Sequence, residues 1–202
     1  MKRKMGNIES TLNKIAENKG TVLDLRNKGI SEIPGEALLK CELLQRINLA
    51  GNKLKVLPEE IGKLGALGYL NLFANKLETL PTTITRCDLI ELNVSVNLLK
   101  ELPRGFGTFK NLAILDLSSN KLEELSPQIG LLVSLREFQV SFNLLKKLPK
   151  EIGRLVELRH FSCASNQLIE LPVEIGGLKS LETLDISSNK LQVSSLKIIK
   201  IF

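Results

Sequence analysis

The segment Leu44-Gln45-Arg46-Ile47-Asn48-Leu49-Ala50-Gly51-Asn52-Lys53-Leu54 decides the fold, because its pattern of leucines and asparagine recurs along the chain. Segments of the same pattern begin at positions 67, 89, 112, 135, 158 and 181, and the asparagines stand at positions 52, 75, 97, 120, 143, 166 and 189. The step between copies is 23 residues five times and 22 residues once. A degenerate first copy, residues 20–30, carries Lys28 in place of the asparagine, so that the chain holds eight copies of one structural unit.

The apolar residues of each copy predict a short strand. Ile47 and Leu49 flank Asn48, so apolar side chains point to one side of the strand and the intervening side chains to the other. Stacked copies therefore predict one parallel sheet with a leucine-rich interior. The recurring asparagine stands where the chain leaves the strand, and its amide can satisfy backbone groups that the turn leaves unpaired.

A second recurring segment follows most copies, with the pattern Leu-Pro-x-x-Ile-Gly-x-Leu. All prolines of the chain lie in it, with one displaced by a residue, and they are Pro34, Pro58, Pro81, Pro103, Pro127, Pro149 and Pro172. Proline suits the first position of a helical turn, and glycine disfavours a long helix. We therefore expect a short helix or 3-10 turn in each of these segments.

The combined pattern LxxLxLxxNxLxxLPxxIGxLxx resembles the leucine-rich repeat solenoid, and in particular the intracellular Ras-group type with 23-residue repeats. The resemblance covers residues 20–191. It implies an α/β fold, a curved horseshoe with a concave parallel sheet of about eight short strands and short helical or 3-10 convex segments. It also implies protein recognition without catalysis, and the family's partners suggest a small GTPase, a phosphatase or a kinase.

The two ends of the chain depart from the repeat. Residues 1–19 form a basic leader and a capping helix whose apolar stripe is Ile8, Leu12, Ile15 and Ala16. Residues 192–202 read as an atypical apolar tail or cap, which indicates a truncated product or an end-to-end dimer through this edge. The repeat domain between them is residues 20–191, and its lack of a cysteine-rich cap favours a reducing, cytoplasmic location.

An alternative function rests on the segment Met5-Gly6-Asn7-Ile8-Glu9-Ser10, which matches the N-myristoylation pattern. It requires synthesis to start at Met5, or a protease to expose Gly6, and it would make the chain a membrane-tethered adaptor. One myristoyl chain binds membranes only weakly, so stable anchoring would need a partner. The opening from Met5 to Leu23 also resembles that of the leucine-rich repeat-containing protein 57 family, a small cytoplasmic family without assigned enzymatic activity.

Composition and charge exclude several function classes. The 202 residues are 43% hydrophobic and 25% charged, which is ordinary for a globular chain, and no apolar run reaches the length of a bilayer-spanning helix. The net charge of +6 divides into +3 in residues 1–20, +2 in residues 192–202 and +1 in the body. Because the body has no basic cluster with stacking aromatic residues, nucleic acid is not an expected partner. A membrane is expected only if Gly6 is acylated.

No catalytic, metal or cofactor site emerges from the residues. The chain has one histidine and three cysteines, and Cys41, Cys87 and Cys163 all take leucine positions of the repeat. His160 and Cys163 are three residues apart on a predicted strand, so they face opposite sides of the sheet and form no dyad. The acids of the sheet face are too far apart for paired carboxylate chemistry. An enzyme with an unrecognised site is therefore the least favoured alternative.

The remaining candidate is the concave face of the sheet. Large side chains gather at its N-terminal half, where Arg26, Arg46, Tyr69 and Phe73 are the expected anchors of a protein partner, since arginine and tyrosine dominate interface energetics. Glu91, Glu137 and His160 occupy the same position of the repeat as Arg46 and Tyr69, so they continue one column across the sheet and are expected contact residues. Small polar side chains between them would let a partner approach the backbone.

A second expected contact region lies just beyond the strands. Two copies place an apolar pair beside the recurring asparagine, Val96 with Leu98 and Phe142 with Leu144, where most copies have polar residues. These residues either pack against each other or form an apolar interaction rim. The sequence thus predicts a non-enzymatic scaffold or adaptor for protein partners, with a role in intracellular signalling.

Overall fold

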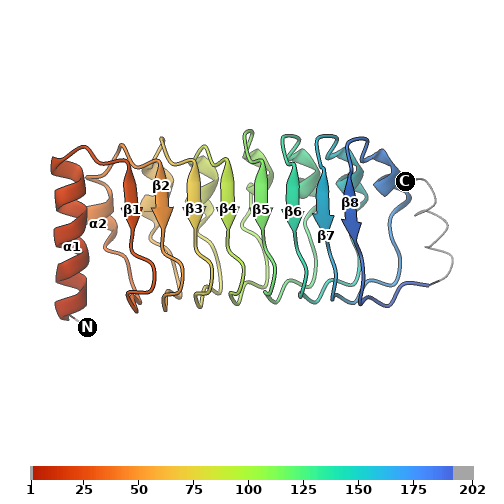
Figure 1. Ribbon diagram of the computed structural model, residues 1–202, viewed down its shortest axis with the longest axis horizontal. Coiled ribbons are helices and arrows are strands. Elements are labelled where there is room, and N and C mark those ends of the chain that lie inside the picture. Colours follow the sequence, from red (N-terminus) through yellow and green to blue (C-terminus); the bar gives the residue numbers. More distant parts are fainter. Residues whose placement is uncertain (1, 193–202) are drawn as a thin grey trace.

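The computed structural model describes residues 2–192, and side chains from residue 6 onward, as a row of stacked repeats (Figure 1). Within these residues eight parallel strands form one open sheet, in which spatial order follows sequence order. The strands are β1 (Val22–Asp24), β2 (Arg46–Asn48), β3 (Tyr69–Asn71), β4 (Glu91–Asn93), β5 (Ile114–Asp116), β6 (Glu137–Gln139), β7 (His160–Ser162) and β8 (Thr183–Asp185). The predicted leucine-rich repeat horseshoe is therefore confirmed.

Equivalent positions of neighbouring repeats lie side by side, because every pair of adjacent strands is in register. The middle residue of each strand points inward, and from β1 to β7 it is buried. Leucine or isoleucine occupies this position except in β6 and β7, where the rings of Phe138 and Phe161 stack with centroids 5.4 Å apart. The residues on either side of it point outward and form the sheet surface.

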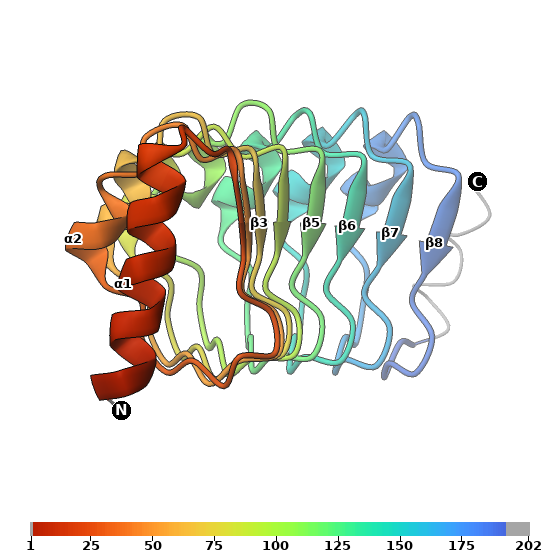
Figure 2. The same ribbon diagram turned by 60° about the vertical axis from the view of Figure 1, so that its left-hand side comes forward.

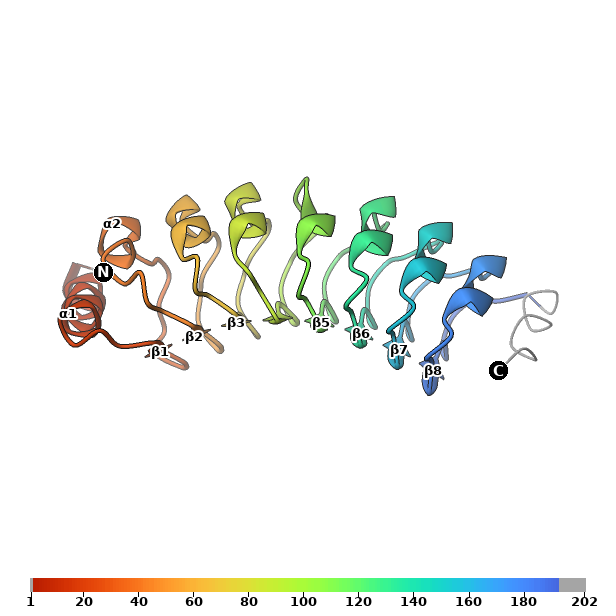
Figure 3. The same ribbon diagram turned by 90° about the horizontal axis from the view of Figure 1, so that it is seen from above.

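Short helical segments form the outer layer of the solenoid. Figure 3 shows a shallow arch with the sheet along its inner side and these segments along its outer side. They are α2 (Gly35–Leu38) and the 3-10 helices η1 (Glu59–Lys63), η2 (Thr82–Arg86), η3 (Phe106–Thr108), η4 (Pro127–Leu131), η5 (Lys150–Arg154) and η6 (Val173–Gly177).

The proline before each outer helix corrects one expectation. Pro58 and most of its equivalents are extended N-cap residues, one position before the helix, rather than its first residue. The fixed φ of proline suits both positions, so the sequence alone does not separate them. Only Pro127, which is displaced by one residue, opens its helix, and there the Ser126 side chain accepts a hydrogen bond from the Gln128 N–H.

The recurring asparagines form the predicted polar ladder inside the stack. Asn97 shows the arrangement: its Nδ2 donates to the carbonyl oxygens of Leu72 and Val94, and its Oδ1 accepts from the Leu77 N–H. Each asparagine therefore joins its own turn to the preceding repeat. Among the described residues, no buried side-chain nitrogen or oxygen lacks a partner.

Helix α1 (Lys2–Glu17) covers the N-terminal end of the solenoid beside β1 (Figures 1 and 2). Ile8 and Leu12 are buried in the core cluster, and Ile15 and Ala16 pack against it. The helix begins at Lys2, so the basic residues assigned to a leader are part of it. The predicted apolar tail or cap, with Leu196 and Ile198, and the end-to-end dimer expected from it concern residues 193–202, which lie outside the described residues.

Candidate functional site

The first group of expected anchors meets on the concave face at β2, β3 and β4. Arg46, Tyr69 and Glu91 are register partners on these adjacent strands, all pointing outward. The Arg46 guanidinium carbon lies 3.6 Å from the centroid of the Tyr69 ring, which is a cation–π stack. These residues, with Asp24 of β1 and Asn71 of β3, line a shallow hollow of about 260 Å³. We call this feature the concave hollow.

Arg26 and Phe73 lie beside the concave hollow rather than in its lining. The Arg26 Nη2 pairs with the Asp24 Oδ2 at 2.9 Å, with both side chains substantially exposed. Phe73 is 43% exposed, whereas Tyr69 is half-buried beneath the Arg46 guanidinium. The two aromatic residues therefore do not act as one exposed pair, because the arginine on the neighbouring strand covers only Tyr69.

Charges of both signs surround the concave hollow. Arg46 and Arg26 supply two cations at the β1 and β2 end, and Asp24 and Glu91 supply carboxylates. Arg26 is already paired with Asp24, whereas Arg46 and Glu91 form no ion pair with any other described residue. An arginine already held against an aromatic ring loses little side-chain entropy when it binds a carboxylate.

The outward-facing Asn or Asp that ends most strands has a structural role that the sequence reasoning missed. The Asn71 Oδ1 accepts from the N–H of Phe73, two residues ahead, at 3.0 Å. The same bond recurs in five other repeats, where the accepting side chains are Asp24, Asn48, Asn93, Asp116 and Asp185. These side chains hold the turn that leaves each strand. The signal was an Asn or Asp placed two residues before a turn.

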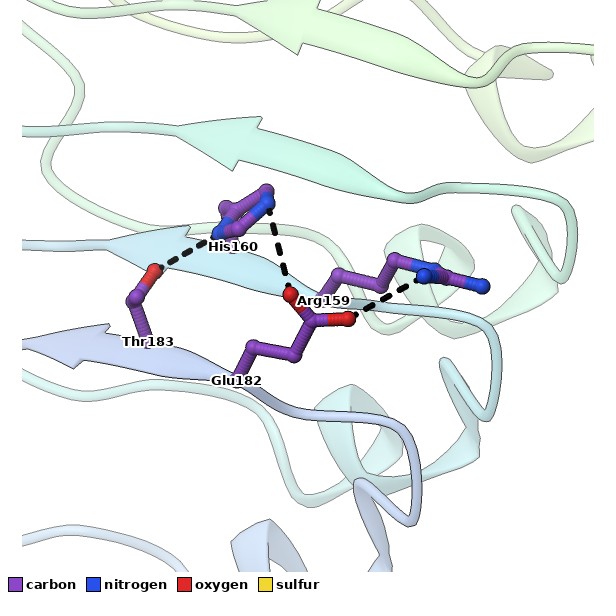
Figure 4. Close-up of polar contacts among 4 residues, drawn as sticks. All are labelled: Arg159, His160, Glu182 and Thr183. Atoms are coloured by element: carbon purple, nitrogen blue, oxygen red, sulfur yellow. Dashed lines mark hydrogen bonds and ion pairs between the residues drawn. The ribbon is translucent and has the colours of Figure 1, made fainter.

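His160 belongs to a separate polar cluster on β7 and β8 (Figure 4). Its Nδ1 lies 2.9 Å from the Thr183 Oγ1, and its Nε2 lies 3.9 Å from the Glu182 Oε2. Glu182 also accepts from Arg159 at 3.1 Å. Sequence reasoning missed Arg159 and Glu182, although residues 23 positions apart are neighbours in this fold. Glu137, expected in the same outer column, is exposed on β6, next to His160 on β7.

The three cysteines lie in the core, as predicted. Burial raises the pKa of Cys87 to about 11, and burial together with the Asp185 carboxylate raises the pKa of Cys163 to about 12. Cys163 is fully buried, whereas His160 is on the sheet surface, so they face opposite sides. A thiol with this pKa carries almost no thiolate at neutral pH, so it is not a nucleophile.

The predicted rim residues lie on the turns beyond β4 and β6. Val96 is 44% exposed and Phe142 63% exposed, and Leu144 is exposed while Leu98 is half-buried. None of these four residues lines the concave hollow. The structure thus separates the expected contact residues into three groups: the concave hollow, the His160 cluster and the rim. Gly6 is exposed within α1, and an added Cβ would meet no atom within 4 Å there.

The described residues contain no group of three or more His, Cys, Asp or Glu side chains arranged to hold a metal ion. No helix in this part of the chain is both long enough and apolar enough to cross a membrane.

Comparisons with protein-family models find leucine-rich repeats in three parts of the chain. One model, leucine rich repeat, matches residues 21–77, a two-copy leucine rich repeat model matches residues 156–198, and a single-repeat model matches residues 111–132. A comparison with curated proteins finds no match.

Solved structures supply similar solenoids. A leucine-rich repeat protein of Leptospira interrogans is 30% identical over 94% of this chain, with a TM-score of 0.63. The plant peptide hormone receptor RGFR1, solved in complex with RGF2, is 31% identical over 88% of this chain, with a TM-score of 0.77. A TDR receptor is 27% identical over 94%, with a TM-score of 0.72. The chain spans 61%, 30% and 39% of these three structures.

Proposed function

Because the chain is a leucine-rich repeat protein, we propose that it is a non-enzymatic scaffold whose concave hollow binds a protein partner. The observation that carries the proposal is the stack of the exposed Arg46 on the half-buried Tyr69, beside Glu91 in a hollow of about 260 Å³. Arginine and tyrosine provide large, rigid contact area and are the side chains on which interface energy concentrates. The receptor RGFR1, which shares the fold, was solved in complex with RGF2.

The chemistry of the hollow favours a partner segment that carries a carboxylate. Arg46 is held over the face of the Tyr69 ring and presents N–H donors that can bond in pairs to a carboxylate. Phe73 and Arg26 border the hollow and would contact flanking parts of the same partner. By analogy with the Ras-group type, we propose that this partner is a small GTPase, a phosphatase or a kinase of intracellular signalling. The resemblance to the leucine-rich repeat-containing protein 57 family supports a cytoplasmic location.

Quantitative affinity capture from cells tests this function. Tyr69→Ala combined with Arg46→Ala should lose at least tenfold in recovery of the partners that wild type retains, because both halves of the stack are removed. Val173→Ala is the matched control, since this exposed residue lies on η6 on the convex side. Equal recovery by the hollow variant and wild type would remove the concave hollow as the binding site.

The lipid-tethered alternative rests on Gly6, which is exposed and has open space around its Cα. It requires a chain that begins at Gly6, with the first turn of α1 removed. Intact mass of the protein from eukaryotic cells decides this alternative, since a myristoyl group adds a defined mass to a chain that starts at Gly6. An unmodified N-terminus would end it.

A further inference from the structure

Val96 and Phe142 occupy a backbone position that disfavours them. The residue three positions after each strand has a positive φ in all eight repeats, and six of these are Asn27, Gly51, Ala74, Ser119, Ser165 and Ser188. In the other two repeats Val96 and Phe142 adopt a φ of 56°. This left-handed region crowds the Cβ against the backbone, and branched or bulky residues rarely enter it.

The strain at these positions is not offset by burial. Phe142 is 63% exposed and Val96 is 44% exposed, so a large part of each residue stays in water in the free protein and gains nothing from burial. Leu144 and Leu98 extend the two apolar sites on the same turns. Strained, exposed apolar residues on two turns point to a function outside folding. We call these four residues the edge patch: Val96, Leu98, Phe142 and Leu144.

The spacing of the edge patch is regular. Its two halves follow β4 and β6, so they stand about two strand spacings, or 9–10 Å, apart along the solenoid. The turn after β5 lies between them and supplies Ser119 and Lys121 at the equivalent positions. Lys121 is exposed and forms no ion pair with any described residue. The patch is therefore two apolar sites with a free cation midway between them.

We propose that the edge patch binds one amphipathic α-helix of a partner protein, lying along the row of strands. Residues i and i+7 of a helix are about 10.5 Å apart on nearly one face, which matches two strand spacings. Residues i+3 and i+4 stand about 4.5–6 Å from i, which matches the position of Lys121. The partner helix therefore carries apolar residues at i and i+7 and an acidic residue between them.

This inference rests on the proposed scaffold function but uses a surface separate from the concave hollow. Phage that display helices with randomised outward positions are the probe, selected on wild type after subtraction on Val96→Ser/Phe142→Ser. We expect enriched helices with the i, i+7 apolar pair and a central Asp or Glu, which bind the double variant at least tenfold more weakly. Failure to enrich any helix, or helices that bind both proteins equally, would overturn the proposal.

Two further variants separate the edge patch from its alternatives. Lys121→Glu should weaken the selected helices several-fold at low salt, and changing the central acid of the helix to Lys should restore the binding. Arg46→Ala/Tyr69→Ala should bind them as wild type does, so that failure of the concave hollow and failure of the edge patch give different results. Val173→Ser controls for loss of an exposed valine elsewhere.

Thermal unfolding of Phe142→Asn distinguishes binding from local packing. Asparagine tolerates the left-handed region better than phenylalanine, so this variant should lose helix binding while its Tm stays unchanged or rises by about 2–4 °C. A fall in Tm of that size would show that Phe142 packs within the free protein, and would contradict the assignment of the edge patch to a partner.

Discussion

At the scale of single residues, the asparagine ladder is the polar feature on which the stack depends. Replacing Asn97 with Ala leaves the buried Leu77 N–H without its acceptor, and it leaves the Leu72 and Val94 carbonyls with one donor each, Asn75 and Asn120. We expect a loss of about 1–3 kcal/mol in the free energy of unfolding, because an unsatisfied buried donor carries its full desolvation cost. Urea denaturation measures it. The exposed Asn111→Ala should change stability by less than about 0.5 kcal/mol, and an equal loss there would contradict the ladder's role.

The buried thiols make the free energy of unfolding fall as the pH rises through the alkaline range. The pKa of Cys87 is raised from 9.0 to about 11 and that of Cys163 to about 12, in both cases mainly by burial. The unfolded chain therefore releases these protons from about pH 9 while the folded chain keeps them, which favours unfolding as the pH rises. Their stabilising contribution is fully present below pH 9 and is lost as the pH rises through 11 to 12.

Urea denaturation at a series of pH values measures this dependence. The free energy of unfolding of each protein is expressed relative to its own value at pH 8. Between pH 9 and 11 it should fall more steeply for wild type than for Cys87→Ala/Cys163→Ala. Comparison with the double variant isolates the thiols from the lysines and Tyr69, which are common to both proteins. Identical slopes would show that the thiols titrate as they do in the unfolded chain.

The outward positions could be predicted residue by residue, whereas their contacts could not. Alternation along each strand placed Arg46, Tyr69 and Glu91 on one surface, because inward positions are set by leucine. It did not show that Arg46 lies over Tyr69 and leaves Phe73 apart, since rotamers depend on neighbours across the sheet. The positive φ of Val96 and Phe142 was equally hidden, because their residue types argue against it.

At the scale of elements, the glycine of the outer segment sets how closely neighbouring 3-10 helices approach. A Cβ on Gly130 of η4 would collide with the backbone carbonyl oxygen of Glu151 in η5. We expect Gly130→Ala to cost about 1–3 kcal/mol, because the two helices must move apart. Gly65→Ala is the control, since nothing lies within 4 Å of its Cβ position. Equal urea midpoints for both variants would show that the helices tolerate wider spacing.

The chain already contains a natural example of this constraint. In η2, Thr85 occupies the position that Gly130 occupies in η4. The next outer helix, η3, is only three residues long, and it starts after Gly105, whose φ is 81°. The sequence predicted short outer helices from Leu-Pro and Ile-Gly, but not their lengths. Length here depends on contacts between repeats. The start of α1 at Lys2 was likewise not predicted, because helix boundaries are poorly defined by sequence.

At the scale of the whole molecule, the repeat makes contacts almost one-dimensional. Each unit packs only on its neighbours, so stability is a sum of local terms and the ends unfold first. The same regularity places functional side chains at fixed intervals. The concave hollow lies on β1 to β4, whereas the edge patch lies on the turns beyond β4 and β6, so that two segments of partner proteins could bind at once.

A cap mutation tests this one-dimensional behaviour. Leu12 of α1 is fully buried against the first repeat, and Leu12→Ala should cost about 2–5 kcal/mol at that end. By hydrogen exchange, the Leu25 N–H and Leu49 N–H, which bond to the next strand, should then exchange faster. Amides of β5 and β6 should keep wild-type rates. Ile175→Ala in η6 is the mirrored control, which should affect β7 and β8 instead. Equal acceleration in every strand after either change would mean that the solenoid unfolds as one cooperative unit.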